Sequence, residues 1–338
     1  MKNKNGATIH DVAALAGVSI STVSRYLSDM GNVSAYTAYN IRNAIRELDY
    51  QPNVFAQNLR KNVSNIIGVI TPSANYYFAE SYRAISDYFY LKGYMTYLCH
   101  SDNDAEKEQF FIQGLVNQKA AGLVVISCGS NTEFLSKIVN NYDQTCMIIL
   151  DRPEDVGCDI VTEDHEENAY LLTSHVLRHL SGNRPVVMMF GTEKASSTQK
   201  IVCGMRKAFE EDPSSPREKQ MFLNCQTSDA LKSAVTCVSD YIKKGMRPQI
   251  IAFGPNLLET AVRELHRLAI SVRDKHVDVA GFALPDSMDW LGISFPSVIQ
   301  NPDYSGIVAA EVLYKHIQGK SKTDNPQTYK INVKLNLT

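Results

Sequence analysis

From residue 66 onward, short apolar runs alternate with helical stretches, and this alternation restricts the fold more than any other feature of the sequence. Residues 66–70 form a short run of apolar residues, as is typical of a buried parallel strand. Similar runs follow at 94–99, 123–126, 146–150, 186–190, 220–224, 249–253 and 277–282. Helical stretches lie between most of these runs, at 79–91, 106–118, 167–180, 199–211, 230–244 and 257–268. Strand–helix alternation of this kind predicts doubly wound α/β units.

The predicted strands are too many for one comfortable sheet, so we expect two successive α/β lobes. We predict that the chain crosses between them near Ile160, near 293–298 and near Asp324. The cleft at the carboxyl ends of both sheets is where small ligands bind in such folds. The predicted parts are a head at 1–52, a connecting segment at 53–64 and a body at 65–338, with a first lobe at about 65–160 and 293–324 and a second at about 161–292 and 325–338.

The sequence carries no sign of a membrane segment or an export signal. No run of 18 uncharged apolar residues occurs, so no transmembrane helix is expected. The first six residues lead straight into a polar helical pattern and lack the apolar core of a signal peptide. The seven cysteines are widely spaced without a CxxC pair, which is typical of free thiols in a reducing compartment. We therefore expect a cytoplasmic protein.

The first 60 residues are predicted to be helical, with turns that separate the segments. Thr8 stands at an expected N-cap, and Asp11 follows it in the capping-box position. Gly17 permits a turn, after which Ser19 caps a second helix, and a third helix begins at Ser34. Two helices that are joined by a short turn containing glycine form a helix-turn-helix.

The exposed face of the second predicted helix suits a DNA groove. It carries short hydroxyl groups, one apolar side chain and one guanidinium, which can lie against base edges and phosphates. These residues are Ile20, Ser21, Thr22, Ser24 and Arg25. Residues 1–64 hold seven Lys and Arg against four Asp and Glu, a formal charge of +3, whereas the whole chain carries −2. From these residues alone, DNA binding and a plain small helical bundle both remain open.

Five pieces of the head carry a resemblance to a known family. They are Thr-Ile-His-Asp-Val-Ala-Ala-Leu-Ala-Gly-Val-Ser at 8–19, Thr-Val-Ser-Arg at 22–25, Val-Ser-Ala-Tyr-Thr at 33–37, Tyr-Gln-Pro-Asn at 50–53 and Leu-Arg at 59–60. Their residues and spacing resemble the head of the lactose-repressor/galactose-repressor (LacI/GalR) family of transcription regulators. Looser resemblance continues through the body at 67–70, 121–125, 151–152, 204, 281–282 and 300.

The resemblance implies both a fold and a set of partners. The fold is a small all-α helix-turn-helix head on an α/β, two-lobed, periplasmic-binding-protein-like body that has two doubly wound parallel sheets. The partners are a second copy of the chain in a homodimer, a pseudo-palindromic operator in double-stranded DNA, and a small-molecule effector. Ile20 and Ser21 fall on the positions that read bases. The other head residues implied in DNA contact are Thr8, Ser19, Thr22, Ser24, Arg25, Ser34, Tyr36 and Thr37.

Residues 54–60 resemble the hinge helix of this family, which folds only on DNA. An isolated helix of about seven residues is marginal in water, which agrees with folding that is coupled to binding. Leu59 resembles the apolar wedge that enters the minor groove and kinks the duplex. An ordinary helix-packing leucine is the alternative. Asn53, Gln57 and Arg60 are predicted to face the DNA backbone and the groove edges.

In the body, the resemblance implies a small molecule between the lobes, most often a sugar, a nucleobase or a sugar phosphate. The sequence departs from the family at three polar positions. Ile201 replaces an Arg of many sugar binders, Ala283 replaces a common Asp, and 255–256 replaces the usual Asn-Asp pair. Such groups bind hydroxyls through charge-assisted hydrogen bonds, so their loss argues against a simple neutral hexose.

Two segments, 254–260 and 329–335, resemble the fructose- and sucrose-responsive repressors. For each remaining cleft candidate, ordinary core packing or loop capping is the alternative role. The predicted effector-binding residues are Asn75, Tyr77, Phe78, Ser127, Asp151, Arg152, Asp164, Phe253 and Asn256.

The sequence offers no support for catalysis, a metal or a cofactor. His175 and His179 have helical i,i+4 spacing, but Val176 occupies the place of the glutamate in an HExxH site. No GxSxG, no P-loop and no GxGxxG after a strand occurs. The rival interpretation is a two-lobed sugar-binding receptor or sensor without DNA regulation, which has no use for residues 1–60. We therefore predict a DNA-binding regulator, a repressor, controlled by a metabolite that is a sugar or a sugar phosphate.

Overall fold

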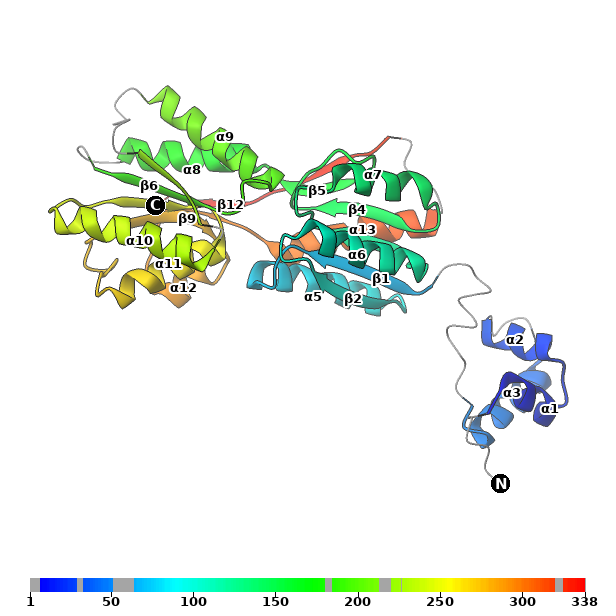
Figure 1. Cartoon of the computed structure of the whole chain (residues 1–338). Helices are drawn as coiled ribbons and strands as arrows, with labels where there is room; N and C mark the ends of the chain where they lie inside the picture. The colour runs from blue at the N-terminus through cyan, green and yellow to red at the C-terminus, as the bar shows by residue number, and fades with distance from the viewer. Residues whose placement is uncertain are drawn as a thin grey trace. The chain divides into compact units, whose positions relative to one another are not determined.

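The computed structural model describes residues 7–28, 33–50, 64–179, 184–212, 220–225, 227–319 and 325–337. The chain divides into two compact units, Met1–Ser64 and Asn65–Thr338 (Figure 1). Within these ranges, no helix combines the length and the apolar character that a membrane span needs.

The first unit packs its described helices around a small apolar core. Val12, Val23 and Ile41 come from three different helices, are fully buried and belong to one cluster. This arrangement confirms the predicted helix-turn-helix and its third helix. The helices are α1 (Ile9–Ala16), α2 (Ile20–Ser28) and α3 (Ala35–Glu47).

The helix ends of the first unit follow from local side-chain chemistry. The Thr8 hydroxyl accepts a hydrogen bond from the Asp11 N–H, and the Asp11 carboxylate accepts one from the Thr8 N–H at 2.8 Å. This is the predicted capping box. Gly17 ends α1 at φ +65°, a left-handed conformation that glycine adopts without strain. The Ser34 hydroxyl accepts a hydrogen bond from the Thr37 N–H and thereby caps α3.

The first lobe of the body is a parallel sheet covered on both faces, with the strand order β11-β5-β4-β3-β1-β2. Alternate strand residues such as Ile70 and Leu123 pack with α6 and α7 in one cluster, while α5 and α13 lie side by side on the opposite face (Figure 1). The strands are β1 (Ile66–Thr71), β2 (Met95–His100), β3 (Gly122–Val125), β4 (Cys146–Leu150), β5 (Ile160–Glu163) and β11 (Thr328–Ile331). The helices are α5 (Tyr76–Tyr90), α6 (Ala105–Asn117), α7 (Thr132–Asn141) and α13 (Pro302–Gly319).

The second lobe repeats this architecture with the strand order β12-β10-β9-β8-β6-β7. Its strands are parallel except β12, which pairs antiparallel with β10 and corrects the expectation of a purely parallel sheet. Helices α8 and α9 cover one face, and α10 and α11 cover the other. The strands are β6 (Val186–Phe190), β7 (Gln220–Asn224), β8 (Gln249–Ala252), β9 (Asp278–Ala283), β10 (Ser297–Ile299) and β12 (Lys334–Asn336). The helices are α8 (His165–His179), α9 (Ser196–Glu211), α10 (Ser228–Lys243), α11 (Pro255–Arg267) and α12 (Ser287–Leu291).

Glycines let two helix pairs approach closely. A Cβ atom at Gly204 of α9 would lie 2.0 Å from the Glu166 carbonyl oxygen of α8, and one at Gly306 of α13 would lie 2.5 Å from the Ser81 carbonyl oxygen of α5. A side chain at either position would therefore force the helices apart.

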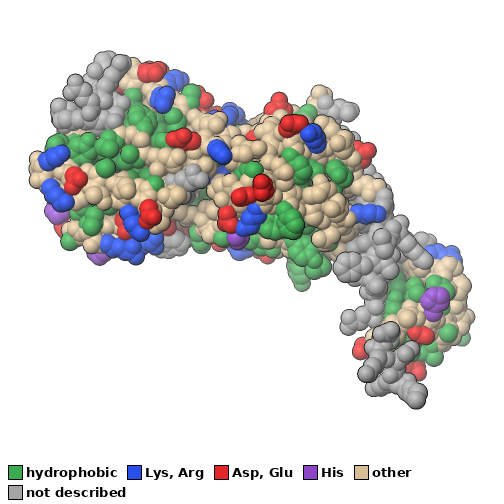
Figure 2. All heavy atoms as spheres, in the orientation of Figure 1, with side chains coloured by type: hydrophobic (Ala, Val, Ile, Leu, Met, Phe, Trp, Pro, Cys, Tyr) green, Lys and Arg blue, Asp and Glu red, His purple; other side chains and the backbone are tan. Residues whose placement is uncertain are grey.

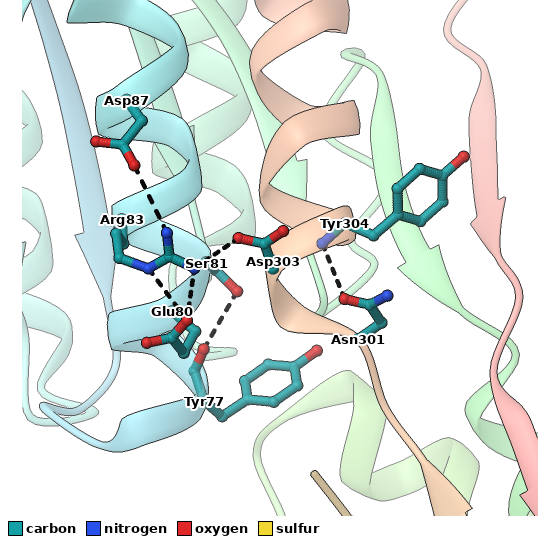
Figure 3. A network of polar contacts seen from close by, with 8 residues as sticks. All are labelled: Tyr77, Glu80, Ser81, Arg83, Asp87, Asn301, Asp303 and Tyr304. Carbon is teal, nitrogen blue, oxygen red and sulfur yellow. Dashed lines mark hydrogen bonds and ion pairs between the residues drawn. The ribbon is translucent and has the colours of Figure 1, made fainter. Parts of the chain in front are cut away.

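The α5–α13 pair is also joined by charge. Arg83 of α5 pairs with Glu80 and Asp87 on its own helix and reaches Asp303 of α13 at 2.8 Å (Figure 3). All these groups are partly exposed, so the network orients the helices more than it stabilises them. The Asn301 side chain accepts a hydrogen bond from the Tyr304 N–H at the start of α13.

The chain crosses between the lobes at other residues than the sequence predicted. Ile160 does not begin the second lobe, because the strand that starts there still pairs with β4 and β11 in the first sheet. Residues 297–299 belong to the second sheet, not the first, and 328–331 belong to the first sheet, not the second. The crossings are therefore at 164, 300–301 and 332–333. The predicted lobe boundaries were wrong there because the strands beside the crossings have only three or four residues. Runs this short do not show in the sequence which sheet they join.

Candidate functional site

Helix α2 presents a polar face that is anchored from behind by the core of the first unit. Val23 and Tyr26 are buried on its inner side, whereas Ser21 and Arg25 are exposed. Arg25 makes no ion pair with the described residues, so its guanidinium is available to a phosphate or a base edge. The chain thus presents the hydroxyl and guanidinium groups that the sequence predicted for this face.

Hydroxyl groups gather at the start of α2. The Ser19 Oγ atom accepts a hydrogen bond from the Thr22 N–H at 3.2 Å, and it lies 2.7 Å from Ser21 Oγ and 2.8 Å from Thr22 Oγ1. Ile20 beside them is half-buried. Helix N-termini with hydroxyl donors are suited to DNA phosphates, since backbone N–H groups and hydroxyls both bind them.

The start of α3 carries a second group of predicted DNA contacts. Ser34 Oγ lies 2.9 Å from Thr37 Oγ1, and Tyr36 projects with 76% of its surface exposed. Thr8 and Ser24 also lie on described helices or their caps. The hinge predictions at Asn53, Gln57, Leu59 and Arg60 lie outside the described residues.

A cavity of about 530 Å³ lies between the two lobes of the body. Its size is within the range of small-molecule sites. Two of the nine predicted effector residues, Ser127 and Asp164, do not line it. The seven that do are Asn75, Tyr77, Phe78, Asp151, Arg152, Phe253 and Asn256.

The first-lobe wall of the cavity is held by a buried polar network. The Tyr77 hydroxyl donates to Asp151 Oδ1 at 3.2 Å, and Arg152 Nη1 donates to Asn103 Oδ1 and to the Ser127 carbonyl oxygen at 2.8 Å each. Burial and the Asp151 carboxylate raise the pKa of Tyr77 well above its ordinary value. Burial also lowers the pKa of Arg152 from its ordinary value. Asp151 has φ +66°, a left-handed conformation that is uncommon for non-glycine residues and that Asp adopts more readily than most.

Ser127 and Asp164 support the cavity from outside. Ser127 is buried, and its hydroxyl accepts a hydrogen bond from the Gly129 N–H at 3.0 Å. Asp164 pairs with Lys330 at 2.6 Å and caps α8 by accepting the Glu167 N–H. The Lys330 hydrogen bond lowers the pKa of Asp164. Asp164 lies at the first crossing, and Lys330 lies in the strand before the third, so the pair joins two of the three connections between the lobes.

Glu163 and Gln300 join the remaining crossing. The Gln300 amide donates to Glu163 Oε2 at 2.8 Å, while Glu163 Oε1 has no hydrogen-bond partner among the described residues. His165, the first residue of α8, donates from Nε2 to the Asp151 carbonyl oxygen at 2.8 Å. Burial raises the pKa of Glu163 to about 8, and the Asp151 carboxylate adds to the shift. Gln300 and His165 line the cavity, so residues at the crossings between the lobes form part of its wall.

We expect Glu163→Gln to change how stability depends on pH. Glu163 ionises near 4.5 in the unfolded chain but near 8 in the folded one, so the folded state holds an extra proton between these values. Stability therefore falls as the pH rises through this window and stays low above it. Glutamine cannot ionise and still accepts the Gln300 hydrogen bond. The variant should be more stable than the wild type above pH 8, by on the order of 2–4 kcal/mol, and should lose this advantage below pH 4.5.

Melting temperatures across this pH range check the Glu163 prediction. Glu193→Gln serves as the control, because Glu193 is exposed and its removal leaves the buried carboxylate in place. Parallel pH profiles for the wild type and Glu163→Gln would contradict the assignment.

On the second-lobe wall of the cavity, the sequence singled out Phe253 and Asn256 but not the other polar residues. This wall contains the starts of α9, α10 and α11, with Thr192, Ser197, Thr198 and Arg263 among the lining residues. These helices follow β6, β7 and β8, and ligands in such folds bind at the carboxyl ends of the strands. The expected position of the cleft therefore indicated this wall, but it did not identify these residues. Ile201, the departure from the family's arginine, also lines the cavity. Gly129 of the first lobe approaches this wall so closely that a Cβ would lie 2.1 Å from the Lys194 carbonyl oxygen.

His175 and His179 are explained by their own helix. His179 Nδ1 donates to the His175 carbonyl oxygen at 2.8 Å, and the two rings lie 4.2 Å apart. Among the described residues, no group of three or more His, Cys, Asp or Glu side chains could hold a metal ion.

Two family models match the chain. Residues 8–53 match the bacterial regulatory proteins of the lacI family, and residues 67–321 match the periplasmic binding protein domain. The chain belongs to the LacI/GalR family of regulators. The predicted resemblance to the family is thus confirmed, while its fructose- and sucrose-responsive sub-group stays a prediction.

Relatives of this LacI-family chain are described as transcriptional repressors. The chain is 26% identical over 320 residues to the HTH-type transcriptional repressor PurR of Vibrio parahaemolyticus, with 93% of each sequence covered. The lac repressor dimer bound to operator and the anti-inducer ONPF has a TM-score of 0.78 at 20% identity and 98% coverage of each chain. A complex of the transcriptional regulator CelR with cellobiose has a TM-score of 0.64 at 19% identity, also over 98% of each chain. The predicted fold class is confirmed.

Proposed function

We propose that this LacI-family protein is a sequence-specific DNA-binding repressor that acts in the cytoplasm and is not an enzyme. Its operator affinity is controlled by a small metabolite in the cavity between the lobes. The observation that carries the proposal is the exposed hydroxyl and guanidinium face of α2 on a core-anchored helix-turn-helix, in one chain with a two-lobed body that encloses a cavity. The relatives described as repressors support it.

We assign the DNA contacts as the sequence predicted them. Ile20 and Ser21 lie at the start of the recognition helix, where side chains reach base edges. Thr8, Ser19, Ser34 and Tyr36 lie at or near helix N-termini suited to phosphates. Leu59 is proposed as the minor-groove wedge, because an apolar side chain between base steps stabilises a kinked duplex.

The body offers a face for a second copy of the chain. Strand β2 is an edge strand of the first sheet, and its residues Met95, Tyr97 and Leu98 are exposed. Tyr90 and Phe110 on the neighbouring helices are more than 70% exposed, and hydrophobic side chains gather over α5, α6 and β2 (Figure 2). An apolar patch along an open strand edge is typical of a protein interface. We propose that this face forms the homodimer, since the similar lac repressor structure is described as a dimer bound to operator.

Linkage explains how the cavity can control DNA binding. The three crossings are joined by the Asp164–Lys330 and Glu163–Gln300 pairs, so the two lobes move about a defined hinge. A ligand that contacts both walls binds one lobe arrangement better than the other and shifts the population toward it. If that arrangement favours DNA binding in the dimer, the ligand raises operator affinity, and if it disfavours DNA binding, the ligand lowers it by the same coupling.

Salt dependence tests the proposed DNA binding. The full chain should bind a duplex selected from a random library, and its affinity should fall steeply with salt because neutralised phosphates release counterions. A log–log slope of several units is expected from fluorescence anisotropy between about 50 and 200 mM salt. The rival role, a two-lobed receptor without DNA regulation, predicts no selected sequence, and an affinity that ignores salt would refute the proposal.

A further inference from the structure

Two buried carboxylates lie at the junction of the two lobes. Asp151 and Glu163 are only 9% and 3% exposed. Asp151 accepts a hydrogen bond from the Tyr77 hydroxyl, and Glu163 accepts one from the Gln300 amide, so both carboxylates have neutral donors. The negative charge of each carboxylate disfavours ionisation of the other, and burial strengthens this effect. The pair is therefore most stable with one proton bound.

The cations beside this pair bond to other groups. Lys330 of β11 pairs with Asp164 at 2.6 Å. Arg152 donates to Asn103 Oδ1 and to the Ser127 carbonyl oxygen. Among the described residues, neither cation forms a hydrogen bond or an ion pair with Glu163. A charge on Glu163 is therefore poorly compensated.

Two polar atoms of the same cluster are buried without a partner. They are Glu163 Oε1 and His165 Nδ1, for which the described residues offer no hydrogen bond. His165 Nε2 donates to the Asp151 carbonyl oxygen, and Tyr77 of α5 is the remaining titratable side chain of the cluster. Buried polar atoms are normally paired. An ionised Glu163 would thus lack both a cation and the hydrogen bonds that its charge needs.

The position of Glu163 connects this cluster to the movement of the lobes. Glu163 is the last residue of β5, directly before the first crossing, and Gln300 lies at the second crossing. Gln300 and His165 line the cavity, so water that enters between parted lobes reaches the cluster. Parting the lobes therefore hydrates the Glu163 carboxylate and makes its ionisation easier.

The described arrangement of the lobes is a closed one on the far side of the cavity. A Cβ atom on Gly129 of the first lobe would lie 2.1 Å from the Lys194 carbonyl oxygen of the second. Gly129 follows β3 and Lys194 follows β6, so this contact lies between the carboxyl ends of two central strands. Parting the lobes breaks it, and the segments around both residues can report the opening.

We propose that Glu163 is a proton-controlled switch in the hinge: its protonated form favours the closed lobes, and its ionisation favours the open ones. The effect of this switch on DNA rests on the proposed repressor function. The closed arrangement binds a proton that a hydrated Glu163 in the open arrangement releases. Rising pH therefore shifts the population toward the open lobes.

The pKa of Glu163 sets the pH window of the switch. Burial and the Asp151 carboxylate raise this pKa to about 8 in the closed arrangement, whereas a hydrated glutamate ionises near 4.5. Between these values, the ratio of open to closed molecules rises with pH by up to about 10-fold per pH unit. Above pH 8 both arrangements are ionised, so the ratio stays constant.

Hydrogen–deuterium exchange of the free, full-length chain tests the proposal. Segments 127–131 and 192–197 lie on the two sides of the Gly129–Lys194 contact and should exchange faster when the lobes part. The wild type and Glu163→Gln are compared at the same pH, so the intrinsic effect of pH on exchange cancels. The ratio of the wild-type rate to the variant rate should rise by about 10-fold or more between about pH 5.5 and 8, and then level off.

Three further variants separate the switch from a purely structural role. Glu163→Asp keeps an ionisable group, so its exchange should still rise with pH relative to Glu163→Gln. His165→Asn removes the other titratable ring beside Asp151, and the rise should remain. Glu167→Gln is the matched control, because Glu167 is an exposed carboxylate in the first turn of α8. This variant should behave like the wild type.

Two results would overturn the proposal. In the first, the wild type and Glu163→Gln keep a constant ratio of exchange rates at every pH. In the second, His165→Asn abolishes the rise, which would assign the proton to the histidine. Operator binding is measured on the same preparations at matched ionic strength. If the exchange ratio rises as expected while no duplex is selected at any pH, the hinge switch stands and the proposed repressor function fails.

Discussion

Gly204→Ala is expected to destabilise the body of the protein by about 3 kcal/mol. The new Cβ would lie 2.0 Å from the Glu166 carbonyl oxygen and 3.0 Å from the Tyr170 nitrogen, and all of these are backbone-anchored atoms of α8. Helices α8 and α9 must therefore separate, which also disturbs the cluster that holds Leu172 and Met205. Urea unfolding followed by circular dichroism measures the change.

Gly114→Ala is the matched control for this effect. Gly114 lies inside α6, and a Cβ there would meet nothing within 4 Å. The same chemical change should therefore stabilise the protein, by about 0.5–1 kcal/mol, because alanine loses less backbone entropy in a helix. Equal changes in the free energy of unfolding for the two substitutions would show that the close approach of α8 and α9 does not contribute to stability.

Arg25→Ala is expected to weaken operator binding by about 10- to 100-fold. Arg25 is exposed at the end of the α2 face, and its removal costs no ion pair within the described residues. The melting temperature of the free protein should stay the same. Anisotropy titration with the selected operator at one fixed salt concentration measures the loss.

Arg46→Ala controls for the loss of charge alone. Arg46 is exposed in the last turn of α3, so the variant has the same net charge as Arg25→Ala. It should weaken binding much less. Exchange of Ile20 and Ser21 for other residues should instead change which half-site is selected, since these residues are proposed to read bases. Equal losses in the two arginine variants would mean that α2 attracts DNA only through overall charge.

The features that the sequence predicted correctly depend on contacts between close neighbours in the chain. The capping box of Thr8 and Asp11 and the turn at Gly17 need only the residues that stand beside them. The strands at 146–150, 186–190 and 220–224 have the predicted bounds, because each contains an apolar run that ends at polar, proline or glycine residues. Such local chemistry is visible in a single sequence.

The missed features depend on partners distant in the chain. Strand β5 has four residues, and it belongs to the first sheet because of its pairing with β11, 168 residues later in the sequence. Asp164 looked like a cavity residue, but its partner is Lys330. Seven cavity residues were found from strand ends, whereas Ser197, Thr198 and Arg263 were missed because hydroxyls and arginines on helices have no distinctive local pattern.

The interleaved lobes have a consequence for how the protein is made. The ribosome synthesises β1 to β5 of the first lobe early, but α13, which covers the α5 side of that sheet, is made only after nearly all of the second lobe. A nascent chain that ends before residue 302 therefore holds helices α8 to α12 of the second lobe, while the older lobe still exposes an apolar sheet face. The lobe that is translated first is thus completed only when nearly the whole chain has been made. During synthesis it is the part that most needs a chaperone, and stalled translation after β9 should release aggregation-prone fragments.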